Sequence, residues 1–321
     1  MSWPSIPLVL LASLAAAPPV APATPYPEKP VRIIVPAPTD SRSDRVARLV
    51  APLIGAHFSE QFLVDNRSGS AGLLGTEIAA RAKPDGYTLV IGSPSTLTTT
   101  TFRRLTTPYD VIKDFTPIGV VAVSPFVLTA HPTVPAADMN GLLSFARITR
   151  GRLTYGAITP GGTAVAAMEL LQTAAKIDFK RQGYPVQAEL IGQLLSGSDS
   201  IGMLDIFDAL DHVRARRLRP IAVTSSRRST ALPQVPTAAE SGLSGFDATK
   251  WTGLLAPART PPEIASELSI GLRRALLNPG VRWQLGQEGM LPGEGDAATF
   301  AVRLQREIEI YGKLKKPLPW P

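Results

Sequence analysis

Residues 66–93 read NRSGSAGLLGTEIAARAKPDGYTLVIGS, and they hold a glycine-rich turn, a helix and a strand in that order. The helical pattern runs from Leu73 to Lys83, the Pro-Asp-Gly sequence at 84–86 is a turn signal, and the apolar run at 87–92 predicts a strand. Residues 61–66, QFLVDN, predict another strand just before the turn. Strand, helix and strand in this order predict a parallel α/β sheet.

The glycines of this turn are Gly69, Gly72 and Gly75. A dinucleotide-binding loop needs the spacing G-x-G-x-x-G, and a Walker loop needs a lysine after its last glycine; this stretch has neither. The glycines therefore predict a tight turn and close packing of the helix against the sheet, and not a phosphate site.

The same alternation extends along the chain in both directions. Residues 31–35 predict a buried strand, and an apolar face from Val46 to Ile54 predicts a helix capped by Ser43 or Asp44. The long apolar run at 116–132 suits a strand that passes from one domain to another, and residues 250–257 suit its return.

A second α/β set lies between the crossing and the return. We expect helices at 138–149, 163–176 and 187–196, strands at 153–157, 178–184, 200–205 and 219–224, and two closing helices near 261–278 and 297–315. This order predicts two discontinuous lobes joined by a hinge. The carboxyl ends of the strands, where such sheets bind ligands, can then face one cleft.

The composition narrows the class of protein. The chain has 321 residues, of which 44% are hydrophobic and 18% charged, with a net charge of +7 and no cysteine. The absence of cysteine excludes disulfides and thiolate chemistry. Basic residues gather at Arg214, Arg216, Arg217 and Arg219, but aromatic residues are not interleaved with them, so we expect solvated faces and no nucleic-acid partner.

The first residues resemble an export signal. An apolar core at 6–17 is followed by small residues and by the Ala-Pro-Ala sequence at 21–23, although no Lys or Arg precedes the core. The core is too short for a stable membrane-spanning helix. We expect cleavage after Ala23 and a periplasmic protein.

Catalytic and metal-binding patterns are sparse. The histidines are His57, His131 and His212, and each is expected to be structural or solvated. Neither a G-x-S-x-G nor an H-E-x-x-H motif is present, and no cluster has metal-ligand spacing. The sequence predicts a protein that is not an enzyme, with no cofactor and no metal.

A set of motifs spread over the chain resembles one known family. YPEKPVRIIVPAP, the 66–93 stretch, YDVIKDFTPI, LRPIAVTSSRRSTALPQVPTAAESGL and WTGLLAPARTPPEI follow one another from Tyr26 onward. Together they are similar to the periplasmic solute-binding proteins of tripartite tricarboxylate transporters, also called Bug receptors. The resemblance extends to about Tyr311.

The resemblance implies a two-lobed Venus-flytrap fold in which each lobe has a mostly parallel sheet flanked by helices. We expect a signal peptide at 1–23, lobe I at 24–125 plus 250–321, and lobe II at 126–249. The resemblance implies a monomer that captures a small carboxylated solute between the lobes and delivers it to membrane permease subunits. The alternative is a periplasmic sensing or adaptor protein whose ligand binding is altered or lost.

The resemblance also places ligand-binding residues on the loops that face the cleft. In lobe I the family pattern P-F-P-P-G-G becomes PAPTDS at 36–41, so Asp40 and Ser41 replace two glycines that let backbone amides approach an anion. Asp40 either faces the cleft or caps the helix, and Arg42 either clamps a carboxylate or is solvated. The predicted contacts from this lobe are Thr39, Asp40, Ser41, Ser43, Ser93 and Ser95.

In lobe II the TPGGTAV turn at 159–165 keeps a plausible backbone nest for an anion, but Val165 stands where the family has a histidine. The predicted contacts from this lobe are Thr159, Gly161, Gly162, Thr163, Tyr184 and Asp205. Carboxylate capture would then rest on backbone amides and small hydroxyls.

Overall fold

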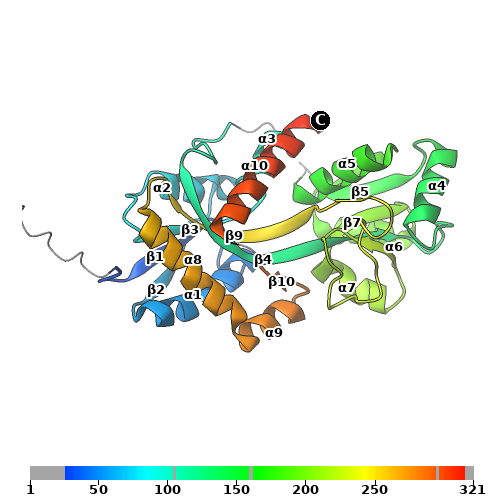
Figure 1. The fold of residues 1–321 in the computed structure, drawn as a ribbon. Coiled ribbons are helices and arrows are strands. Elements are labelled where there is room, and N and C mark those ends of the chain that lie inside the picture. Colours follow the sequence, from blue (N-terminus) through cyan, green and yellow to red (C-terminus); the bar gives the residue numbers. More distant parts are fainter. Residues whose placement is uncertain (1–25, 104–105, 159–161, 294–295, 315–321) are drawn as a thin grey trace, which may run out of the picture.

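The computed structural model describes residues 26–103, 106–158, 162–293 and 296–314. The predicted signal peptide lies outside these residues. Within them, ten strands form one sheet, whose main path runs β2-β1-β3-β9-β4-β7-β5-β6, while β8 and β10 also pair with β4. Figure 1 shows an elongated molecule in which β4 and β9 connect two groups of strands and helices. The predicted two-lobed α/β architecture is confirmed.

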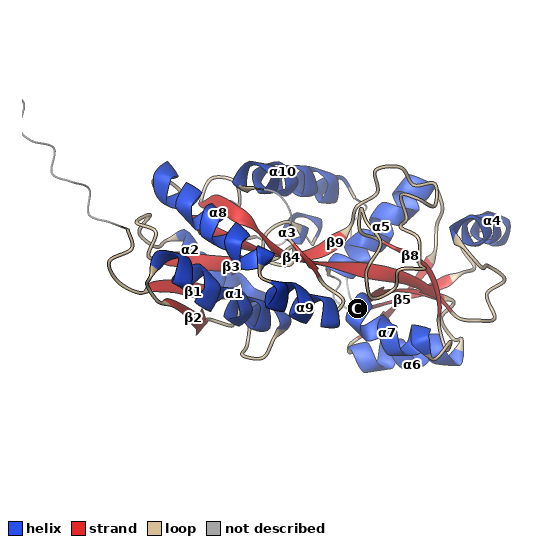
Figure 2. Ribbon diagram, turned by 60° about the horizontal axis from the view of Figure 1, so that its bottom comes forward, coloured by secondary structure: helices blue, strands red, loops and turns tan. Residues whose placement is uncertain are grey.

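Lobe I is built around three parallel strands, with β1 between β2 and β3. The strands are β1 (Val31–Val35), β2 (Phe62–Asn66) and β3 (Thr88–Gly92). The helices of this lobe are α1 (Arg42–Phe58), α2 (Leu73–Ala80), α3 (Thr99–Phe102), α8 (Pro262–Leu277), α9 (Pro279–Gln287) and α10 (Ala297–Lys313), with a short 3₁₀ helix at Ser70–Gly72. Helices α1, α8 and α9 lie together beside these strands (Figure 2).

Lobe II repeats this plan, with β5 lying parallel to β6 and β7. Its strands are β5 (Thr154–Ile158), β6 (Lys180–Tyr184), β7 (Ile201–Asp205) and β8 (Arg219–Val223). Its helices are α4 (Met139–Thr149), α5 (Thr163–Ala175), α6 (Gln187–Ser196) and α7 (Ile206–Arg214).

Two long antiparallel strands cross between the lobes, as the sequence predicted: β4 (Phe115–Ala130) and β9 (Thr249–Pro257). Strand β4 pairs with β9 up to Pro125 and with β7 from Phe126 onward. The lobe limits stay a prediction, and this change of partner supports the limit at 125/126. The short strand β10 (Leu291–Pro292) also pairs with β4.

The glycine-rich turn packs as predicted. Gly72 has φ +92, where side chains are strained, and a Cβ on Gly75 would lie 2.4 Å from the Arg67 carbonyl oxygen and 2.9 Å from the Pro36 Cα. The absence of side chains at these positions lets α2 lie directly against the segment that follows β1.

The prediction for the start of α1 was wrong. The helix begins at Arg42, and its N-cap is Ser41, whose hydroxyl accepts a hydrogen bond from the Asp44 amide. Asp44 is instead buried in the first turn, where its carboxylate accepts hydrogen bonds from the Asp40 amide and from Arg48 and Asn66. Helices α3 and α9 and strand β10 were not expected, because the first and last are short and α9 follows α8 with only Asn278 between them.

Candidate functional site

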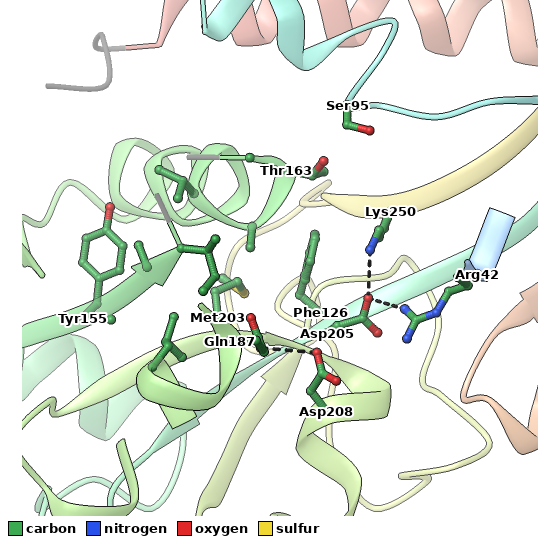
Figure 3. A pocket seen from close by; sticks show the side chains of 17 residues that line it. Arg42, Ser95, Phe126, Tyr155, Thr163, Gln187, Met203, Asp205, Asp208 and Lys250 are labelled. Carbon is green, nitrogen blue, oxygen red and sulfur yellow. Dashed lines mark hydrogen bonds and ion pairs between the residues drawn. The ribbon is translucent and has the colours of Figure 1, made fainter. Parts of the chain in front are cut away.

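A cavity of about 360 Å³ lies where the two lobes meet. Its residues come from α1, β9 and the loop after β3 on one side, and from β4, β5, β7 and the first turns of α5, α6 and α7 on the other. Figure 3 shows these side chains around one space. They are Arg42, Ser95, Phe126, Tyr155, Gly156, Ala157, Ile158, Gly162, Thr163, Ala164, Val165, Gln187, Leu190, Met203, Asp205, Asp208 and Lys250.

The charged end of the cavity is organised by Asp205, the last residue of β7. Its carboxylate forms ion pairs with Arg42, the first residue of α1, and with Lys250 on β9, whose Nζ lies 3.4 Å from Oδ2. Figure 3 shows Asp205 between the two cations. Because Arg42 belongs to lobe I and Asp205 to lobe II, this cluster connects the two lobes across the site.

The backbone and a neighbouring hydroxyl fix the Asp205 carboxylate further. It is the N-cap of α7 and accepts a hydrogen bond from the Phe207 amide at 3.3 Å, which also places its charge at the favourable end of the helix dipole. Ser124 Oγ lies 3.3 Å from Asp205 Oδ1. Only 8% of Asp205 is exposed, so its charge is compensated by these groups and little by water.

Arg42 lies between Asp205 and an aromatic ring. Its guanidinium carbon is 5.5 Å from the centroid of the Phe207 ring, within the range of a cation–π contact. In the part of the chain that the structure describes, the buried Arg42 Nε has no hydrogen-bond partner. Arg42 is therefore held by its contacts with Asp205 and Phe207 of lobe II.

Asp208 is the second carboxylate in the wall, one turn further along α7. Gln187 Nε2 donates a hydrogen bond to its Oδ2 at 3.2 Å. Burial, and then the neighbouring Asp205 carboxylate, raise the pKa of Asp208 above its ordinary value. The ionised form of Asp208 is thus disfavoured where it stands.

The other end of the cavity is apolar. Tyr155, Leu190 and Met203 form its wall, and Phe126 lies between them and Asp205, its partner on β7. All four apolar side chains are at most 5% exposed. The Tyr155 hydroxyl is directed away, to Glu169 at 3.0 Å. Helix α5 begins at the cavity with Thr163, and its N-cap Gly162 makes no side-chain capping hydrogen bond; backbone amides at such a helix start are a common binding site for anions.

The structure brings some of the predicted contacts together. Ser95, Gly162, Thr163 and Asp205 line the cavity, and Ser93 lies next to it, with its Oγ 2.8 Å from that of Ser95. Four other predicted contacts are not among the lining residues, namely Thr39, Ser41, Ser43 and Tyr184, and neither is Asp40. Thr159 and Gly161 lie outside the described residues.

Asp40 occupies neither of the two positions considered for it. It is exposed, it does not line the cavity, and the helix cap is its neighbour Ser41. Its φ of +60 is in the left-handed region, which a glycine adopts without strain, and its amide donates to Asp44. Arg42 is the residue of this loop that reaches the cavity.

Several lining residues were missed by the sequence analysis: Phe126, Tyr155, Gln187, Met203, Asp208 and Lys250. Most of them sit on strands or helices whose apolar pattern indicates core, so no local signal marks them. Asp208 carried one usable signal, because it follows Asp205 by one helical turn at a predicted strand end.

Comparison with known proteins identifies the family. The family model described as tripartite tricarboxylate transporter family receptor matches residues 46–318. The chain belongs to this family.

Related proteins agree with that assignment. BugT of Bordetella pertussis is 30% identical over 285 residues, which cover 88% of this chain and 87% of BugT. A structure of an R. palustris protein with adipate has 30% identity and a TM-score of 0.69, covering 90% of this chain and 96% of the other. MatC from Rhodopseudomonas palustris with bound malate has 28% identity and a TM-score of 0.67, with 89% and 99% covered.

As a member of this receptor family, the protein is a periplasmic solute-binding receptor and not a member of an enzyme family. In the described residues, no helix is long and apolar enough to cross a membrane. The same residues contain no group of three or more side chains that could hold a metal ion.

Proposed function

We propose that this receptor captures a small organic acid in the cavity between its lobes and delivers it to the permease subunits of a tripartite tricarboxylate-type transporter. The observation that carries the proposal is one part of the cavity wall: the start of α5, where Gly162 provides no side-chain cap, together with the hydroxyls of Thr163 and Ser95. Helix amides and hydroxyl groups bind carboxylates. The adipate and malate in the two related structures support the same ligand class.

Binding is tested by a thermal-shift screen of mono-, di- and tricarboxylates, followed by calorimetry on each acid that raises the melting temperature. A ligand present at a hundred times its dissociation constant stabilises the fold by about 2.7 kcal/mol. No stabilisation by any organic acid would overturn the proposal and favour the adaptor alternative.

A matched pair of variants on α5 locates the binding site. Ala164 lines the cavity, whereas Ala174 is exposed on the same helix and does not. Ala164→Phe should abolish binding by filling the cavity, and Ala174→Phe should leave the affinity unchanged. Equal affinities for the two variants would place the ligand elsewhere.

Delivery and export need separate measurements. Uptake of the identified acid by cells should depend on both this receptor and the permease subunits, and the purified receptor should sediment as a monomer. N-terminal sequencing of periplasmic protein should begin at Thr24. Protein found only in the cytosol with Met1 intact would contradict export.

A further inference from the structure

The charges in the cavity wall are balanced within the protein. Two cations, Arg42 and Lys250, and two carboxylates, Asp205 and Asp208, line the space. Asp205 forms ion pairs with both cations. A ligand carboxylate that approaches either cation therefore meets a charge that already has a partner.

Replacing these ion pairs with a ligand carries a cost. Asp205 is almost fully buried, and separating it from Arg42 or Lys250 would leave a poorly hydrated carboxylate. It is also held by the Phe207 amide and by Ser124, so it cannot turn away to water while α7 stays capped. Arg42 and Lys250 are thus poor anchors for a second ligand charge.

The cavity wall also contains groups that can bind an anion and are not paired with Asp205. They are the first-turn amides of α5, the Thr163 hydroxyl and Ser95. A helix N-terminus carries about half of an elementary charge, which suits a single carboxylate. Beyond these groups the wall is apolar, from Phe126 to Tyr155, Leu190 and Met203.

Asp208 further disfavours a second anion. Its hydrogen-bond donor is the uncharged amide of Gln187, and it faces the same space as Asp205. A carboxylate beside it would add a third negative charge around two cations, whereas an ammonium or hydroxyl group would be attracted.

We propose that the ligand of this receptor carries one carboxylate on an apolar body, and that Asp205 excludes dicarboxylates by occupying Arg42 and Lys250. The inference rests on the proposed capture of an organic acid in this cavity. It separates the present receptor from the two related proteins that were solved with dicarboxylates.

The test uses probes that differ by one end group. Hexanoate, adipate and 6-aminohexanoate share a six-carbon chain, and benzoate and terephthalate share a ring. Calorimetry on the full-length mature protein should give hexanoate, 6-aminohexanoate and benzoate at least tenfold higher affinity than their dicarboxylate counterparts.

Asp205→Asn tests the cause of the exclusion. Asparagine is as good an N-cap as aspartate and keeps an oxygen for the Phe207 amide, so α7 should stay capped. The variant frees Arg42 and Lys250, and the preference for hexanoate over adipate should fall at least tenfold or reverse. The control is Asp211→Asn, which removes the same charge from an exposed position of α7 outside the cavity and should leave the preference as it is.

Each outcome decides between the two claims. Adipate binding as tightly as hexanoate to the unmodified receptor overturns the inference but leaves the proposed function standing. An unchanged preference in Asp205→Asn, with a melting temperature that shows the variant is folded, removes the assigned role of Asp205. Failure of every organic acid to bind overturns the proposed function and this inference with it.

Discussion

The Glu307 carboxylate on α10 is predicted to be a major anchor of the hinge region. It accepts hydrogen bonds from Trp251 Nε1 on β9 at 3.0 Å, from Thr98 Oγ1 at 2.8 Å and from Arg303 Nε at 2.8 Å. Trp251 and Thr98 are at most 1% exposed. Helix α10 packs Leu304 into the core of lobe I and Tyr311 into the core of lobe II, so its attachment affects both lobes.

Glu307→Ala leaves two buried donors without an acceptor. At about 1–3 kcal/mol for each unsatisfied group, the variant should lose about 2–6 kcal/mol of the free energy of unfolding. Losing the hydrogen bond from Arg303 adds little to this loss of free energy, because Arg303 is partly exposed and also donates to Thr249. Glu307→Gln keeps one acceptor oxygen and should lose only about 1–2 kcal/mol.

The assay is urea denaturation followed by far-ultraviolet circular dichroism. The control is Glu309→Ala, which removes an exposed carboxylate of the same helix and its ion pair with Lys313, and which should not move the urea midpoint. The reasoning is refuted if Glu307→Ala costs less than about 1 kcal/mol, or if Glu307→Gln costs as much as Glu307→Ala.

Three further predictions concern packing and charge. Gly75→Ala should lower the free energy of unfolding by about 1–3 kcal/mol, because the added Cβ would meet the backbone. Gly192→Ala, at an open position of α6, should raise the free energy of unfolding by about 0.5–1 kcal/mol in the same urea titration. Asp208→Asn should melt at a higher temperature than the unmodified protein at pH 7, because folding disfavours the ionised form of Asp208. The difference in melting temperature should disappear as the pH falls to about 4, and a difference that does not change with pH would contradict this. Burial opposes ionisation of Asp44, but the hydrogen bonds of its carboxylate outweigh burial and lower its pKa. Asp44→Asn should therefore melt at a lower temperature than the unmodified protein at pH 7. This difference in melting temperature should disappear as the pH falls below about 4 and through the lowered pKa.

Most of the fold could be predicted from the sequence because the signals for its elements are local. The apolar run of β1, the Pro-Asp-Gly turn before β3 and the glycines before α2 each depend on neighbours within a few residues. The crossing strands β4 and β9 could be predicted for the same reason, since each is one long apolar segment. Short elements such as α3 and β10 lack such a signal.

The site could be predicted only in part, because it is assembled from distant segments. Lys250 belongs to an apolar strand, and nothing near it in the sequence points to Asp205, 45 residues away. Arg42 and Asp205 are 163 residues apart, so their ion pair follows from the packing of the two lobes. Ser95, Gly162, Thr163 and Asp205 were predicted because the family resemblance places ligand contacts at these positions, and the structure brings them to one cavity.

The changed first loop of lobe I has a different consequence from the one its sequence suggests. At the two positions where the family resemblance places glycines, the Asp40 amide donates to Asp44 and the Ser41 hydroxyl caps α1. The same loop supplies Arg42, which reaches across to Asp205 of lobe II. Lobe I therefore contributes Ser95 and two ion-paired side chains, Arg42 and Lys250, whereas the start of α5 with Thr163 belongs to lobe II. The proposed preference for a monocarboxylate rests on this division of roles.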